Sequence, residues 1–179
     1  GQPGQRIQET YYMLKTAFKT QSPKLVLFGT NTMFRDPGFL KNVQLSLTEP
    51  LGYYFPVFRY PNAWKALFDG PGGLKNSYKG FEIRSKVVSY EGDEEYMKET
   101  KEKSEIPQIV KIYMEKIRKL CRKNGADLLL VSAPSPKNYN CKKHNALKEY
   151  ASKHKIPYVD MNMNYREIGI DWKKDSYDR

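Results

Sequence analysis

The sequence contains few of the residues that build metal centres and disulfide frameworks. Its 179 residues include 2 cysteines and 2 histidines. Two cysteines are too few for a disulfide framework, and the apolar spacing around Cys121 favours a buried free thiol on a helix. His144 and His154 alone cannot supply the nitrogen ligands of the usual metal clusters. We therefore expect no metal site and no cofactor.

Long hydrophobic runs are also missing. The sequence has no run of about 18 apolar residues, so none of its segments is expected to span a bilayer. Hydrophobic residues make up 39% of the chain, but 14 tyrosines and 8 phenylalanines provide large side chains for a core. A chain of this length suits one domain, and we predict a single domain over 1–179.

Acidic residues are outnumbered by basic ones, which gives a formal net charge of +11. A basic surface suits anionic partners such as nucleic acid, anionic lipid, teichoic-acid-like polymers or acidic glycans. The lysines are spread along the chain at helical spacing, which is typical of a solvated face. Zinc-finger spacing, RNP-like aromatic motifs and basic-region heptads are absent, so we expect no nucleic-acid partner.

Three units, each a helix followed by a strand, stand out along the chain. The apolar residues recur with the period of one helical face and then form short continuous runs. The predicted helices lie at about 6–18, 106–123 and 142–153, and the predicted strands at Lys24–Phe28, Asp127–Val131 and Tyr158–Asp160. This alternation predicts an α/β fold whose strands are parallel in one sheet, with helices on both faces.

The segment 33–104 follows neither period. Prolines and glycines interrupt its aromatic clusters, and such a long irregular segment in a compact domain is usually a lid or a binding loop. We predict that it is an insertion whose part 53–64 packs over the carboxyl edge of the sheet and walls a pocket. Arg59, Tyr60 and Trp64 are candidate substrate-binding residues, because aromatic and guanidinium groups suit contacts to sugars. An aromatic mini-core under a long loop is the alternative.

Asn31 follows the first predicted strand, after Gly29 and Thr30. In open α/β sheets, ligands bind in the crevice outside the carboxyl ends of the strands, so an amide side chain here is a candidate for chemistry. Glycine and asparagine are also the ordinary residues of a turn that leaves a strand. The sequence around Asn31 is therefore compatible with either role.

The order of these features resembles the SGNH (GDSL-like) hydrolase family. A helix opened by Gly4 is followed by a break at Pro23 and an apolar strand that ends at Asn31. Gly4 matches the glycine block of the family and Asn31 its asparagine block, although Thr32 replaces the usual aspartate. The phrases that carry a narrower likeness, to secreted or membrane-anchored members from Gram-positive bacteria, are Ile7–Tyr12, Leu130–Pro136 and Gly169–Asp175.

The resemblance implies a fold and a reaction. It implies a three-layer α/β/α sandwich of flavodoxin-like type around a parallel sheet. It implies serine attack on an ester, with a histidine base oriented by an aspartate, while the Gly4 backbone N–H and the Asn31 amide hold the oxyanion. The expected activity is that of an esterase or O-acyltransferase on an ester, for example of a cell-envelope glycan or polymer. The expected location is extracytoplasmic, either secreted or membrane-anchored.

Two blocks of the family are not found in these 179 residues. The nucleophile block, a Gly-x-Ser at the end of the first strand, is expected before Gly1, and the Asp/His block after Arg179. Parallel sheets need strands on both sides of their crossover helices, but here a helix begins within a few residues of the start. We therefore expect the chain to be the interior of a larger domain, incomplete at both ends and inactive alone.

Other polar residues are also candidates for catalytic groups. Ser132 and Ser135 follow a strand with His144 nearby, but the surrounding sequence lacks the Gly-x-Ser-x-Gly of a nucleophile elbow, which favours a structural role. His144 lies in the first turn of a predicted helix, where a capping or surface role is commoner. Asp160 ends a strand and suits either the site or a helix cap. The rival function is a non-catalytic module of the same fold that binds an anionic polymer or glycan.

Overall fold

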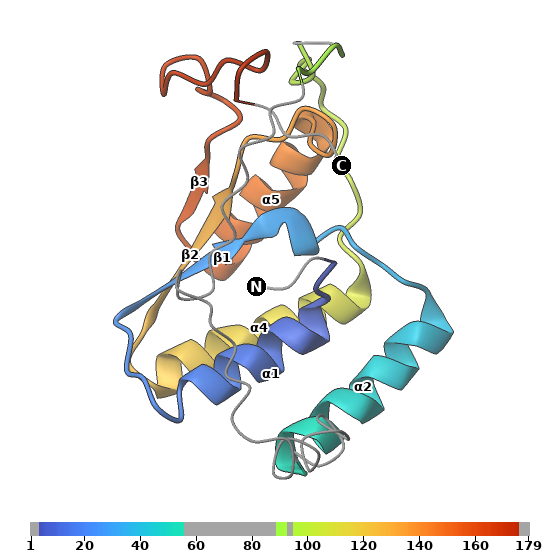
Figure 1. Ribbon diagram of the computed structural model, residues 1–179, viewed down its shortest axis with the longest axis vertical. Coiled ribbons are helices and arrows are strands. Elements are labelled where there is room, and N and C mark those ends of the chain that lie inside the picture. The colour runs from blue at the N-terminus through green and yellow to red at the C-terminus, as the bar shows by residue number, and fades with distance from the viewer. Residues whose placement is uncertain (1–3, 56–88, 93–94, 176–179) are drawn as a thin grey trace, which may run out of the picture.

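The computed structural model describes residues 4–55, 89–92 and 95–175. Each of the three strands is preceded by a helix, and α2 is an additional helix between β1 and α4 (Figure 1). The elements are α1 (Ile7–Ala17), β1 (Leu25–Gly29), the short 3-10 helix η1 (Thr30–Thr32), α2 (Phe39–Tyr54), α4 (Gln108–Lys123), β2 (Asp127–Ser132), α5 (Cys141–His154) and β3 (Tyr158–Asp160). The three predicted helix–strand units are present, with strand ends within one residue of the prediction.

The strands form one parallel sheet in the order β1-β2-β3. The register pairs Leu27 with Leu129, and Val131 with Val159. The predicted parallel arrangement of the three strands is therefore confirmed, and the chain has an α/β fold. All three carboxyl ends meet at the same edge, which is the edge where α/β proteins bind ligands.

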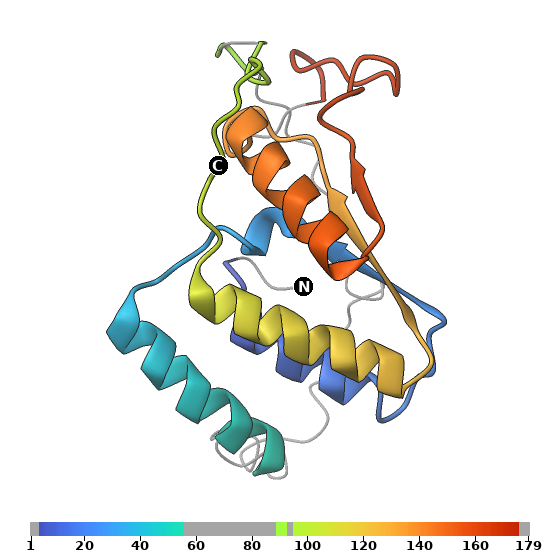
Figure 2. The same cartoon turned by 180° about the vertical axis from the view of Figure 1, so that it is seen from behind.

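The described helices α1, α4 and α5 lie on one side of the sheet (Figures 1 and 2). The strand order runs in a single direction, so right-handed crossovers through α4 and α5 arrive on the same face. Apolar side chains remain on the other face: Leu25, Leu27 and Val159 are 50%, 65% and 48% exposed. Two layers are thus seen among the described residues.

The core lies between α4 and the sheet. Val110, Met114 and Ile117 come from one face of α4, at the spacing that the sequence predicted, and each is fully buried. They belong to one cluster with strand residues Phe28 and Leu130 and with residues of α5. Burying such side chains contributes about 1.5–3 kcal/mol each, so this cluster fixes the position of the strands that lead to the site.

Helix α2 lies within the segment predicted to be irregular. Pro50 sits inside it, although proline lacks the N–H that continues a helix and usually ends one. The helix packs on α1: Gln8 donates to Asn42 at 3.1 Å, and the rings of Tyr12 and Tyr53 lie 5.5 Å apart. Packing on α1 thus stabilises a helix that the local sequence does not favour.

The predicted aromatic wall, 53–64, is described only at its beginning. Tyr53 and Tyr54 end α2 and contact α1, where Lys15 Nζ donates to the Tyr54 hydroxyl at 2.8 Å. The remainder, including the candidate residues Arg59, Tyr60 and Trp64, lies outside the described residues. Within the described ranges, no helix has the length and apolar content to cross a membrane.

Candidate functional site

A row of polar side chains replaces the apolar pattern at the carboxyl edge of the sheet. Thr30 follows β1, while Ser132 and Asp160 end β2 and β3 and are paired by the strand register. Thr30 and Ser132 are buried, and the Asp160 side chain is only 4% exposed. Buried polar groups must find hydrogen-bond partners, so this row has to form a network.

The hydroxyl groups form a continuous chain across the edge. Thr30 Oγ1 lies 2.6 Å from Ser132 Oγ, which lies 3.0 Å from the Tyr158 hydroxyl. The Tyr139 hydroxyl donates to Asp160 Oδ2 at 2.8 Å, and the Tyr158 hydroxyl donates to the same oxygen at 3.0 Å. The chain therefore leads from the residue beside Asn31 to the Asp160 carboxylate.

Asp160 is the centre of this network. Its Oδ2 accepts from His144 Nδ1 at 2.6 Å, and its Oδ1 accepts from the backbone and side-chain nitrogens of Asn162 at 2.9 and 2.8 Å. Burial alone would raise the pKa of Asp160, but the hydrogen bonds from Asn162, His144 and Tyr139 outweigh it and lower that pKa. Asp160 is therefore an ionised carboxylate held by the donors around it.

The two tyrosines of the network stay neutral. Burial raises the pKa of Tyr139 and of Tyr158 above the ordinary value for a phenol. Their hydroxyls can therefore donate to Asp160, while the single proton of Ser132 Oγ is donated to the Tyr139 hydroxyl at 3.2 Å. This chain of neutral hydroxyls ends on the Asp160 carboxylate. It holds the carboxyl edge rigid, because moving one group would break its hydrogen bonds to the neighbouring groups.

Asn31 borders a small hollow next to this network. The hollow has a volume of about 130 Å³, and its lining combines amide, hydroxyl and cationic groups. It is lined by Thr30, Asn31, Phe34, Arg35, Asn138, Tyr139 and Lys143. Lys143 is half-buried and donates to the Asn138 carbonyl at 2.6 Å, and burial lowers the pKa of its ammonium group. The sequence-predicted oxyanion residue thus lies at a polar cavity on the carboxyl edge.

Gly4 lies just before α1. The segment 4–6 runs beside η1 in both views (Figures 1 and 2). Gly4 has a φ of +73°, in the left-handed region that glycine adopts without strain. Space for a side chain exists there, since a Cβ would meet no atom within 4 Å, so the backbone conformation is what requires glycine. Its role as an oxyanion donor stays a prediction.

The two serines of the strand exit serve as structural groups in this arrangement. Ser132 is fully buried and hydrogen-bonded to Thr30, Tyr139 and Tyr158. Its hydroxyl therefore cannot approach a substrate carbonyl without breaking the network. The Ser135 backbone N–H donates to Asn162 Oδ1 at 2.9 Å, which ties the exit loop of β2 to that of β3.

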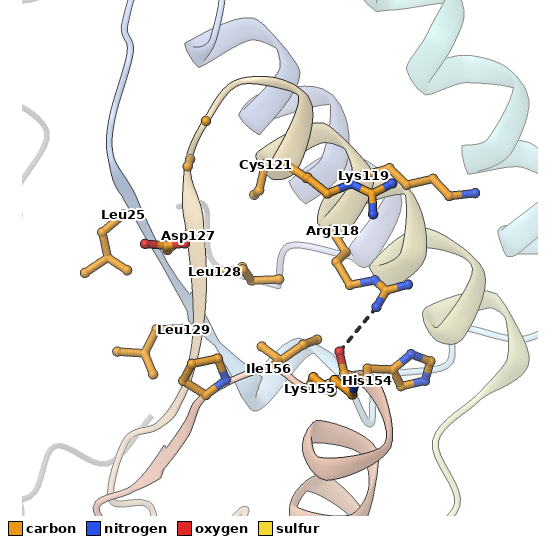
Figure 3. Close-up of a pocket in the computed structure, with 14 residues that line it drawn as sticks. Leu25, Arg118, Lys119, Cys121, Asp127, Leu128, Leu129, His154, Lys155 and Ile156 are labelled. Atoms are coloured by element: carbon orange, nitrogen blue, oxygen red, sulfur yellow. Dashed lines mark hydrogen bonds between the residues drawn. The ribbon is translucent and has the colours of Figure 1, made fainter.

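A larger hollow lies at the opposite, amino edge of the sheet, with a volume of about 670 Å³ (Figure 3). Cys121, Leu128 and Ile156 are turned into it, while Arg118 donates to the His154 carbonyl at 3.2 Å on its rim. Burial raises the pKa of Cys121 to about 11, so its thiol is a poor nucleophile. This hollow is the larger of the two. The carboxyl edge is nevertheless the better candidate for a functional site, because it holds the Asp160 carboxylate, His144 and the Asn31 amide.

Sequence reasoning did not pair His144 with Asp160. A signal was available, since Asn140 caps α5 by accepting from Lys143 N at 3.1 Å, which places His144 in the first turn. The helix N-terminus and the exit of β3 both belong to the carboxyl edge of an α/β unit. Tyr139 and Asn162 gave no comparable signal, because both lie in irregular loops.

Comparisons of this chain with family models, with curated proteins and with solved structures give no match. Among residues 4–55, 89–92 and 95–175, no group of three or more His, Cys, Asp or Glu side chains is placed to hold a metal ion. The interpretation of the site therefore depends on its own geometry.

Proposed function

We propose that the carboxyl edge of the sheet is part of an ester acyl-transfer site of the SGNH type. The position of Asn31 is the observation that supports this proposal most. Asn31 borders a polar hollow at the carboxyl edge of the sheet, which is the edge where α/β proteins bind ligands. An oxyanion hole needs donors that are held in place before the reaction. The buried network from Thr30 to Asp160 supplies such a rigid support directly behind Asn31.

The proposed reaction divides the work between this chain and sequence outside it. Asn31 Nδ2 and the Gly4 backbone N–H donate to the oxygen that becomes negative in the tetrahedral intermediate. The serine nucleophile and its Asp/His pair are expected outside these 179 residues. The serine attacks the ester carbonyl, the alcohol leaves with the proton that histidine took from the serine, and an acyl-enzyme results. Water or an acceptor hydroxyl then releases the acyl group, giving hydrolysis or transfer.

We also propose that a further layer completes a three-layer sandwich. The apolar side chains of Leu25, Leu27 and Val159 are about half exposed or more on one sheet face. Parallel sheets are covered on both faces, because their strands are apolar on both sides. Helices outside the described residues would cover this face. The proposed substrate is an ester of a cell-envelope glycan or polymer, in an extracytoplasmic setting.

Two substitutions at Asn31 separate an oxyanion donor from a turn residue. In the longer protein that contains the nucleophile, Asn31→Ala should lower kcat for a generic aryl ester by about 10²–10³, the usual effect of deleting one such donor. Asn31→Asp keeps the size and the turn preference of asparagine but places a negative charge beside the oxyanion. We expect it to lose at least as much activity as Asn31→Ala.

The control for this test is Asn124→Ala, an exposed asparagine at the amino end of the sheet that should keep full turnover. Circular dichroism must show that all three variants are folded. An Asn31→Asp protein that folds and turns over ester at the wild-type rate would identify Asn31 as a turn residue and remove the proposal.

The 179-residue chain alone should not hydrolyse aryl esters, because Ser132 is enclosed in the network and no other serine is assigned as nucleophile. The measurement is steady-state release of p-nitrophenol from the isolated chain and from its Ser132→Ala variant. Turnover that Ser132→Ala abolishes would place the nucleophile inside this chain and overturn the assignment of roles.

One observation supports the rival function, a non-catalytic module for an anionic polymer or glycan. The hollow beside Asn31 also has Arg35 and Lys143 in its lining, and the chain carries a net charge of +11. Two cations at a small polar hollow suit a carboxylate or phosphate group. Retention on a polyanion column that falls steeply with salt and with Arg35→Gln, in a longer protein without esterase activity, would favour this function.

A further inference from the structure

Helix α2 carries a continuous row of exposed apolar side chains. Phe39 and Leu40 are 80% and 82% exposed at its first turn. The row continues along the helix with Val43, Leu47, Leu51 and Tyr54, which are 43–67% exposed. Large apolar side chains exposed singly are ordinary, but a contiguous row along a whole helix marks an interaction surface.

These side chains share one side of the helix. At about 100° per residue, Phe39, Leu40, Val43, Leu47, Leu51 and Tyr54 fall within a sector of about 120°. The opposite side contains Leu45 and Gly52, which are buried, and Asn42, which accepts from Gln8 of α1. The helix is therefore apolar on two sides, and within residues 4–55, 89–92 and 95–175 only the side facing α1 is covered. We call the uncovered side the outer face of α2.

Two ammonium groups from α1 lie at the C-terminal end of the row. Lys15 Nζ donates to the Tyr54 hydroxyl at 2.8 Å, and Lys19 Nζ lies 4.2 Å from the centroid of the Tyr53 ring. Glu49, the one carboxylate in the sequence of α2, falls by helical geometry on the side that faces α1. Apolar side chains flanked by lysines suit an anionic bilayer surface.

We propose that the outer face of α2 lies on the surface of an anionic lipid bilayer. The helix has 16 residues and so a length of about 24 Å, and it is the outermost helix of the described fold in both views (Figures 1 and 2). It can therefore lie flat along a bilayer with its apolar row among the acyl chains. Two copies of a chain with a net charge of +11 repel each other, which disfavours self-association through this face.

The test uses the 179-residue chain and flotation with lipid vesicles. Vesicles of phosphatidylglycerol and phosphatidylcholine should bring the chain to the top of a density gradient at low salt, and vesicles of phosphatidylcholine alone should do so less well. Leu40→Glu and Leu47→Glu together should reduce the bound fraction at least about tenfold, since each removes a leucine from the apolar layer. Lys15→Gln should weaken binding and reduce its dependence on salt, because it removes the ammonium group beside Tyr54.

Met163→Glu is the matched control, because Met163 is 60% exposed in a loop away from α2. This variant should bind vesicles as the wild type does. Circular dichroism and sedimentation velocity of the same samples complete the test. Absence of vesicle binding by the wild type, or an equal loss with Met163→Glu, would overturn the proposal. A wild-type dimer that Leu40→Glu and Leu47→Glu convert to a monomer, without vesicle binding, would identify a second copy as the partner and also overturn it.

Discussion

Asp160 shows how single residues hold the candidate site. Its carboxylate accepts from His144, Tyr139, Tyr158 and Asn162, and its side chain is 4% exposed. Each of these donors would be left without an acceptor if the carboxylate were removed. The residue therefore fixes the exit of β3, the start of α5 and the loop after β2 in one arrangement.

Asp160→Asn should destabilise the fold by about 3 kcal/mol, because it places an amide N–H₂ among donors and leaves buried groups unpaired. Urea unfolding should show a lower midpoint with an unchanged slope. The control is Asp127→Asn, because Asp127 is exposed to solvent at the start of β2 and its variant should unfold within about 0.5 kcal/mol of the wild type. Equal midpoints for the two variants would contradict the central role of Asp160.

The pH dependence of stability follows from the lowered pKa of Asp160. A depressed folded-state pKa stabilises the fold above the unfolded value of about 3.9, and this contribution is lost as the pH falls through the folded-state pKa. The wild type should therefore lose part of its unfolding free energy below about pH 4. Asp160→Asn should show a shallower loss in the same range, which urea unfolding at several pH values would detect.

At the scale of elements, α4 anchors the sheet. Ile117 is fully buried on its inner face, whereas Ile112 on the same helix is 45% exposed. Ile117→Ala should lower the free energy of unfolding by about 2–5 kcal/mol, since it removes buried surface and leaves a cavity. Ile112→Ala makes the same chemical change on the outer face and should lower it by less than about 1 kcal/mol. Thermal or urea unfolding of both variants would measure the difference, and similar losses would show that the α4 packing is wrongly assigned.

The elements also show where sequence reasoning succeeds. Helices α1, α4 and α5 and their strands could be predicted because apolar residues recur at 3.6 residues and then run together. Helix α2 could not, since Pro50 and two apolar sides obscure a single helical face. The structure shows that contacts from Asn42 and Tyr53 to α1 hold the helix in place. Tertiary packing outweighs local preference in such a helix.

At the scale of the whole molecule, only part of the candidate site can be predicted from the sequence. The position of Asn31 at the carboxyl edge follows from the strand pattern, because parallel strands end together. The network from Thr30 to Asp160 depends on Tyr139 and Asn162, whose positions come from loops without periodic sequence. Long-range pairs such as Thr30 with Ser132 become visible only when the sheet is assembled. The outer face of α2 likewise cannot be recognised from the sequence, because only the folded chain shows which of its two apolar sides α1 covers.

The most direct test of the proposed function is a crystal structure of a longer protein that contains this chain and the proposed serine nucleophile, with a phosphonate adduct on that serine. Such an adduct places an oxygen where the oxyanion of the tetrahedral intermediate would lie. We predict that Asn31 Nδ2 and the Gly4 backbone nitrogen both lie about 2.7–3.1 Å from this oxygen, as an oxyanion hole requires. An adduct whose oxygen is held by other donors, with the Asn31 amide turned away from it, would contradict the account.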